Sequence, residues 1–157
     1  MPGIEFEFQV EGAEELTKKL NNQNLLAKPL RDFLTKAALT VENRTKQLTP
    51  VDTGKLRASI THEVDAMLIP SWAKVGSQTN YAPFVEYDTR PHFPPPAALE
   101  SWAHRHGFSN VFIVCRKIAR RGTKGKKMLT TALEESKEKI NSMMAELGES
   151  IKGKWTE

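Results

Sequence analysis

The sequence predicts an α+β protein, in which a small antiparallel sheet packs against a long helix of the N-terminal half, with further helices and a long amphipathic helix at the C-terminal end. Alternating apolar and polar residues over 4–10 and 57–64 predict half-buried strands. Apolar residues spaced by three and four over 29–50 and 128–151 predict amphipathic helices. A length of 157 residues suits one buried core, so we expect a single domain over 1–157.

The N-terminal part is expected to contain one strand and two helices. Ile4–Val10 alternates so that its apolar residues share one face of a strand. Residues 13–22 predict a short helix with acidic residues in its first turn and lysines later, as the helix dipole favours. The long helix that follows has Pro29 in its first turn and ends at Pro50.

A hairpin is expected after the long helix. Arg57–Val64 can pair with Ala73–Gly76 across a bend at Ile69–Ser71. Tyr81–Tyr87 fits a single helical turn, and a proline-rich loop runs from there to Pro96.

The region 91–127 is expected to form a proline-rich loop and a basic helical insertion. Short helices are predicted over 97–106 and 111–121, and each is followed by a glycine that can end it. The closing helix is predicted over 128–151.

Charge is distributed unevenly along the chain. The net charge is +4, yet the stretch from Trp102 to Lys127 has eight basic residues and no acidic one. Such a stretch suits an acidic protein surface, including a second copy of the chain, or nucleic acid. On a helix over 111–121, two basic rows would flank an apolar stripe of Ile113, Val114, Ile118 and Ala119. The candidate interface residues are Arg116, Lys117, Arg120, Arg121, Lys124, Lys126 and Lys127.

The sequence has no apolar run long enough to span a bilayer and no signal-peptide pattern at its start. We therefore expect the protein to stay in the compartment where it is made and to have no contact with membranes. Cys115 is the only cysteine, so a reducing cytosol is expected and an intrachain disulfide is excluded. Its apolar neighbours predict a buried residue.

Asp52-Thr53-Gly54 matches the tripeptide of aspartic proteases, but its context favours a structural turn. A catalytic aspartate needs a second carboxylate with which to share its proton, and here Lys55 follows instead. We expect Asp52 or Thr53 to close the turn with a side-chain oxygen, and Gly54 to adopt a positive φ. The turn residues are Pro50, Asp52, Thr53 and Gly54.

The other candidates for chemistry also fail on spacing. Residues 122–127 have glycines and lysines, but not the spacing of a nucleotide-binding phosphate loop. His104 and His106 would point to different sides of a helix and could not bind one metal ion. We expect no catalytic residue, no cofactor and no metal site.

Two segments change the interpretation of function. Residues 49–60 read TPVDTGKLRASI and residues 81–89 read YAPFVEYDT, while 118–123 (IARRGT) and 131–133 (TAL) follow later. This order resembles the HK97 gene-product-ten-like family, a tail-component or head-tail neck (tail completion) family of long-tailed phages. In that family a T-P-V-D-T-G-x-L-R-x-S-I segment leads to Y-A-x-x-V-E-x-G-T and later to a closing helix.

The resemblance implies a non-enzymatic virion structural protein of a siphophage or prophage, made in the cytoplasm of the host bacterium. It would act at the head-tail junction, in tail completion or neck assembly. Its implied partners are other copies of itself in a ring and the neighbouring head-tail connector, tail terminator or tail tube proteins, with contact to the exiting DNA. The alternative is a nucleic-acid-binding module that uses the basic 116–127 segment.

Overall fold

The computed structural model describes residues 3–9 and 23–156 and has an α+β fold. Its sheet has three antiparallel strands, in the order β1 (Ile4–Gln9), β3 (Trp72–Ser77), β2 (Ile60–Val64). The central strand β3 pairs with β1 from Ile4 opposite Ser77 and with β2 from Ile60 opposite Ser77. The predicted hairpin and the predicted N-terminal strand are therefore confirmed as parts of one sheet.

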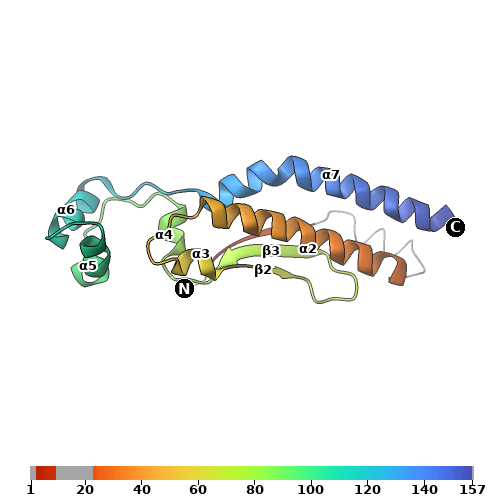
Figure 1. The fold of residues 1–157 in the computed structure, drawn as a ribbon, viewed down its shortest axis with the longest axis horizontal. Coiled ribbons are helices and arrows are strands. Elements are labelled where there is room, and N and C mark those ends of the chain that lie inside the picture. The colour runs from red at the N-terminus through yellow and green to blue at the C-terminus, as the bar shows by residue number, and fades with distance from the viewer. Residues whose placement is uncertain (1–2, 10–22, 157) are drawn as a thin grey trace.

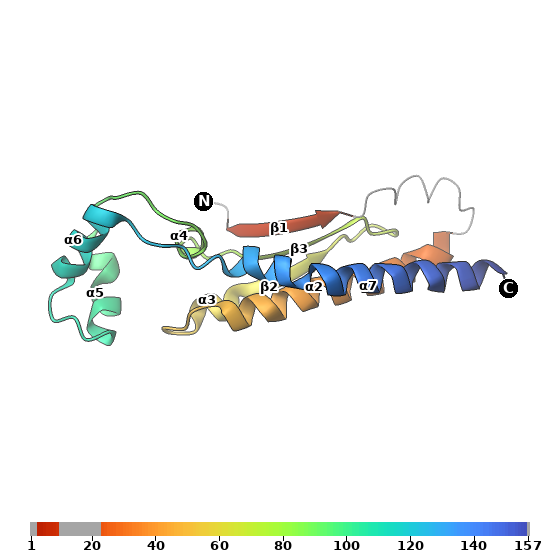
Figure 2. The same ribbon diagram turned by 90° about the horizontal axis from the view of Figure 1, so that it is seen from above.

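Two long helices run side by side along the molecule (Figure 1). Helix α2 (Gln23–Leu48) packs on the sheet and also, along much of its length, on α7 (Met128–Thr156). Figure 2 shows the same arrangement from above, with the sheet along one side of the helical pair. The short helices α3 (Lys55–Ser59) and α4 (Ala82–Glu86) lie near the start of α7.

The hydrophobic core lies where α2, the sheet and α7 meet. Leu34 and Val41 of α2, Ile60 and Val75 of the sheet and Leu129 of α7 are completely buried. Each buried aliphatic side chain of this size stabilises the fold by about 1.5–3 kcal/mol relative to exposure. The three- and four-residue spacing in the sequence thus identified the faces that the two long helices bury.

Helix α2 begins earlier than predicted, so the placement of Pro29 in its first turn was wrong. The helix starts at Gln23 and Pro29 lies inside it. Leu26 and Leu30 are both buried, which extends the apolar stripe one turn upstream of the proline. A proline inside a helix removes one backbone hydrogen bond, and burial of this upstream turn opposes that cost.

The strand predicted over Arg57–Val64 is also shorter than expected, because its first part is the helix α3. Gly54 has φ of +80°, and the Ala58 amide donates to the Gly54 carbonyl at 3.0 Å. The strand begins only at Ile60. Leu56 and Ile60 are both buried, and their spacing of four fits a helical turn as well as an alternating strand.

The remaining elements agree closely with the predicted ones. The helix expected over 97–106 is α5 (Pro96–Arg105), and the helix expected over 111–121 is α6 (Val111–Arg121). Helix α7 continues beyond 151 to Thr156. Val10 and the short helix expected over 13–22 lie outside the described residues.

The loop of the hairpin is held by one buried carboxylate. Asp65 accepts hydrogen bonds from the amides of Met67 and Ser71 and from the Ser71 hydroxyl, at 3.0–3.1 Å. The hydrogen bond from the Ser71 amide is the main reason why the pKa of Asp65 is lowered, and this effect outweighs burial. Arg31 of α2 donates to the carbonyls of Asp65 and Met67, which fixes the loop to the helix.

Candidate assembly surface

Helices α5 and α6 pack on each other and stand apart from the rest of the molecule (Figures 1 and 2). We call residues 96–121 the arm, and the sheet with α2, α3, α4 and α7 the body. Two connecting segments, 87–95 and 122–127, join the arm to the body. The arm lies beyond the N-terminal end of α7, opposite to the end at which α7 finishes.

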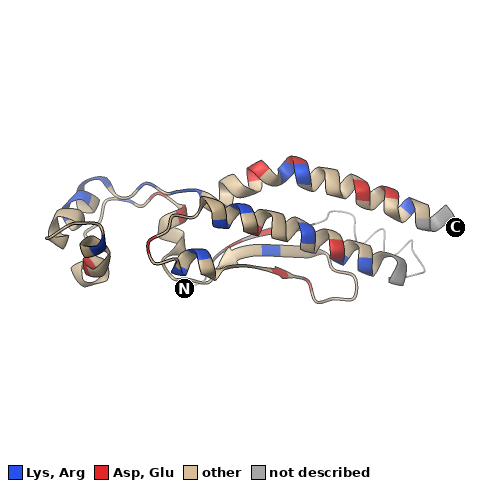
Figure 3. Ribbon diagram, in the orientation of Figure 1, with Lys and Arg blue, Asp and Glu red and all other residues tan. Residues whose placement is uncertain are grey.

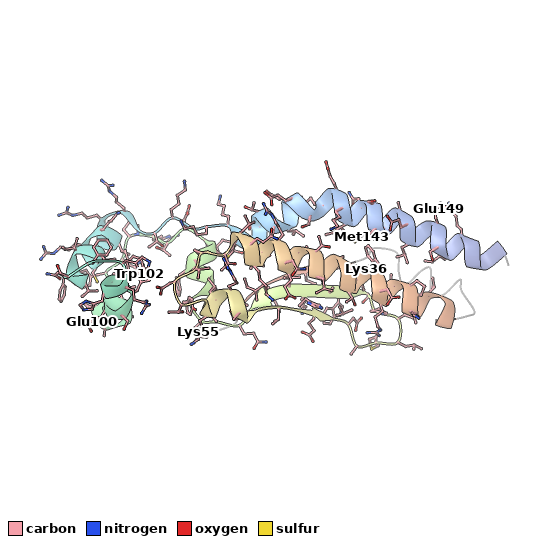
Figure 4. All side chains as sticks on the ribbon, in the orientation of Figure 1. Lys36, Lys55, Glu100, Trp102, Met143 and Glu149 are labelled. Carbon is pink, nitrogen blue, oxygen red and sulfur yellow. The ribbon has the colours of Figure 1, made fainter. Side chains whose placement is uncertain are left out.

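The arm has a small interior of its own. Ala103 of α5 and Cys115 of α6 are buried, so Cys115 is a small core residue as predicted. Trp102, labelled in Figure 4, stacks on His106 at 4.3 Å between ring centroids and on Phe108 at 6.1 Å. The Asn110 side chain accepts from the Phe112 amide at 2.9 Å and caps α6.

The connecting segments are paired with each other and with the body. The Thr89 amide donates to the Thr123 carbonyl at 2.9 Å, and the two threonine hydroxyls are 2.8 Å apart. The Lys126 amide donates to the Val85 carbonyl at 2.7 Å. Gly122 has φ of +67°, and a β-carbon there would lie 1.9 Å from the Thr89 carbonyl oxygen. This close pairing fixes where the arm leaves the body.

Glu86 anchors the body side of this junction, and the sequence analysis did not identify it. Its completely buried carboxylate accepts from the amides of Leu129 and Thr130, each at 3.0 Å, and from the Thr130 hydroxyl at 2.8 Å. These amides belong to the first turn of α7, where unpaired N–H groups and the helix dipole favour a negative charge. No local pattern could reveal this cap, because the partners are more than forty residues apart.

The outward face of α6 has exposed cations around an exposed apolar residue. Arg116, Lys117, Arg120 and Arg121 line a shallow groove together with Ile113, whose exposed fraction is 57%. The prediction of one apolar stripe between two basic rows is therefore wrong for one residue of that stripe. Ile118 and Val114 lie on the partly buried side with Cys115, whereas Ile113 lies among the cations.

Figure 3 shows the cations gathered on α6 and on the segment that leads to α7. Within residues 3–9 and 23–156, the seven candidate interface cations form no ion pair, and every ion pair involves other residues. These seven are Arg116, Lys117, Arg120, Arg121, Lys124, Lys126 and Lys127. Their charge is thus available to another molecule.

The turn after α2 contacts the arm directly. Arg105 donates from Nε to Oδ1 of Asp52 at 2.8 Å and from a terminal nitrogen to Oδ2 at 2.5 Å. This pairing holds the pKa of Asp52 below its usual value. The aspartate therefore links body and arm rather than closing its own turn, while the Thr53 hydroxyl accepts from the Lys55 amide at 3.5 Å. Gly54 has the positive φ that the turn interpretation requires.

A second group of ionisable side chains lies between α2 and β2. Glu42 is buried and hydrogen-bonded to both Lys46 and His62. Burial acts to raise the pKa of Glu42, but the hydrogen bonds from Lys46 and His62 outweigh it and the net shift is downward. This group joins the long helix to the sheet edge and is part of the body.

In the stretches 3–9 and 23–156, no three His, Cys, Asp or Glu side chains are placed to hold a metal ion. The helices of the described chain include none that is long and apolar enough to cross a membrane.

An α+β body with a projecting arm of unpaired cations has the features of a structural protein that contacts other macromolecules. Residues 14–87 match the family described as "Bacteriophage HK97-gp10, putative tail-component", which confirms the resemblance found in the sequence. The match includes α2, α3, β2, β3 and α4 of the body, whereas β1, the arm and α7 lie outside it. Neither a curated protein nor a solved structure matches the chain. The family is one of phage tail components, which are structural parts of a virion.

Proposed function

We propose that this chain is a non-enzymatic structural protein of the phage head-tail junction, acting in tail completion or neck assembly, and that residues 1–157 form a single domain for this role. The observation that carries the proposal is the family match over residues 14–87. The projecting arm with its unpaired cations supports it, because a junction protein needs surfaces that stay open until its partners arrive.

The proposed mechanism is binding alone. Copies of the chain contact one another through two different surfaces, and such heterologous contacts close into a ring when the rotation between copies allows it. The ring then meets the head-tail connector on one side and the tail terminator or tail tube on the other. The arm is mostly basic, whereas the body carries charges of both signs (Figure 3).

Removal of the gene from its phage tests this function. We expect full heads and complete tails that do not join, seen by electron microscopy, and restoration of joined particles when the chain is supplied from a plasmid. A matched plasmid that carries the chain with a stop codon after residue 22 is the control. Joined particles at the normal yield without the chain would contradict the proposal.

The unpaired cations also favour a second candidate, a module that binds nucleic acid through the 116–127 segment. A salt titration separates the two functions. Binding to duplex DNA weakens with a logarithmic slope of about 0.9 per neutralised phosphate, whereas a contact with an apolar centre depends less steeply on salt. A steep slope together with normal head-tail joining after gene removal would favour this second candidate.

A further inference from the structure

We infer that the outward face of α6 binds the acidic face of α7 in a second copy of this chain. The inference rests on the proposed assembly role and specifies which two surfaces meet. The partner is a neighbouring protomer, and the contact is heterologous because α6 of one copy meets α7 of the next.

The first observation is an acidic face on α7 that has no ion-pair partner among residues 3–9 and 23–156. Glu134, Glu138 and Glu146 are exposed, and none of them forms an ion pair among the described residues. The helical repeat of 3.6 residues places Glu134 and Glu138 about 40° apart on one side of α7. Glu146 lies closer to the side on which Glu135 pairs with Arg44 of α2. In contrast, Met143 of the same helix packs against the core (Figure 4).

The second observation is that α6 cannot reach this face within one molecule. The arm lies beyond the first turn of α7, and the paired connecting segments and the Asp52–Arg105 ion pair hold it there (Figure 1). The acidic residues lie farther along α7, in the direction away from the arm. Cations and carboxylates without an ion pair among the described residues therefore occur on two separate surfaces of the same chain.

The third observation is that the two faces match in spacing and are opposite in charge. Arg116 and Arg120 are one helical turn apart, as are Glu134 and Glu138, so two helices side by side can form both ion pairs at intervals of about 6 Å. The exposed Ile113 lies among the cations of α6. Its burial against the neighbouring protomer would supply apolar affinity while the charges set the orientation.

Charge exchange tests this contact in the full-length chain. Sedimentation velocity at low salt measures self-association of the wild type, of R116E/R120E, of E134R/E138R and of the variant with all four changes. We expect each double variant to weaken association about tenfold or more, because like charges then face each other. The fourfold variant should recover association, because both faces are reversed in every copy. K28E/K36E, which reverses two exposed lysines of α2, is the matched control, and circular dichroism verifies folding.

Three results would overturn the inference. The first is a fourfold variant that associates no better than the double variants, and the second is a double variant that associates like the wild type. The third is a wild-type chain that stays monomeric at every concentration. None of these contradicts the head-tail role, which is tested separately by gene removal. Loss of duplex DNA binding in R116E/R120E with unchanged association would assign the cations to DNA instead.

Discussion

The body and the arm differ in whether their charged side chains have partners among the described residues. In the body, the buried carboxylates of Glu42, Asp65 and Glu86 each accept hydrogen bonds from other residues of the body. In the arm and the segment after it, seven cations lack an ion pair within the described residues, and only Arg105 pairs with the body. This difference supports the proposed role of the arm as an assembly surface.

The largest difference between the two regions is expected from truncation of apolar residues. Leu34→Ala in the body should lower the free energy of unfolding by about 2–5 kcal/mol, because the side chain is completely buried and its removal leaves a cavity. Ile113→Ala in the arm should change it by less than about 0.5 kcal/mol, because that side chain is exposed. Urea unfolding measures both variants, and equal losses would remove the distinction between body and arm.

The next largest loss of stability is expected from substitutions at the junction between body and arm. Gly122→Val combines a positive φ with a β-carbon 1.9 Å from the Thr89 carbonyl oxygen, so we expect a loss of about 2–4 kcal/mol. Gly54→Val also places a side chain at a positive φ, but nothing lies within 4 Å of the added β-carbon. This variant should lower the free energy of unfolding by about 1–2 kcal/mol. Thermal unfolding ranks the two variants. A fully stable Gly54→Val protein would contradict the turn geometry.

The cap on α7 should contribute a smaller amount. Glu86→Gln keeps the size of the side chain but removes its charge, so the hydrogen bonds to the first turn of α7 weaken. We expect a loss of about 1–3 kcal/mol, as for buried hydrogen bonds with a charged partner. Hydrogen exchange at the amides of Leu129 and Thr130 measures the local effect. Unchanged exchange would show that Glu86 does not cap this helix.

The sequence predicted what depends on local periodicity. Helix α6 was predicted with the correct ends, and Gly122 is the local signal for its end. The beginnings of α2 and β2 were wrong, since tertiary burial of Leu26 and Leu56 decided them. The Glu86 cap and the Asp52–Arg105 pair could not be predicted, because each joins residues that are distant in the sequence.

The smallest effect on stability is expected at the ion pair between the regions. Asp52→Asn should change the melting temperature at neutral pH only slightly, because the ion pair is largely exposed and is screened by solvent and salt. The folded-state pKa of Asp52 is lowered, so its contribution is present above the unfolded value of about 3.9 and is lost as pH falls through the folded value. The melting temperature of Asp52→Asn should therefore vary less with pH in the acid range than the melting temperature of the wild type. Asp32→Asn is the control.

We propose that the arm serves assembly and contributes little to the stability of the chain. The decisive test is reversal of Arg120 and Arg121 to glutamate in the phage, with the fraction of joined particles counted by electron microscopy. We expect unjoined heads and tails and a lower phage titre, with the melting temperature of the purified variant unchanged and K28E/K36E joining normally. Joined, infectious particles at the normal yield with the reversed arm would contradict it.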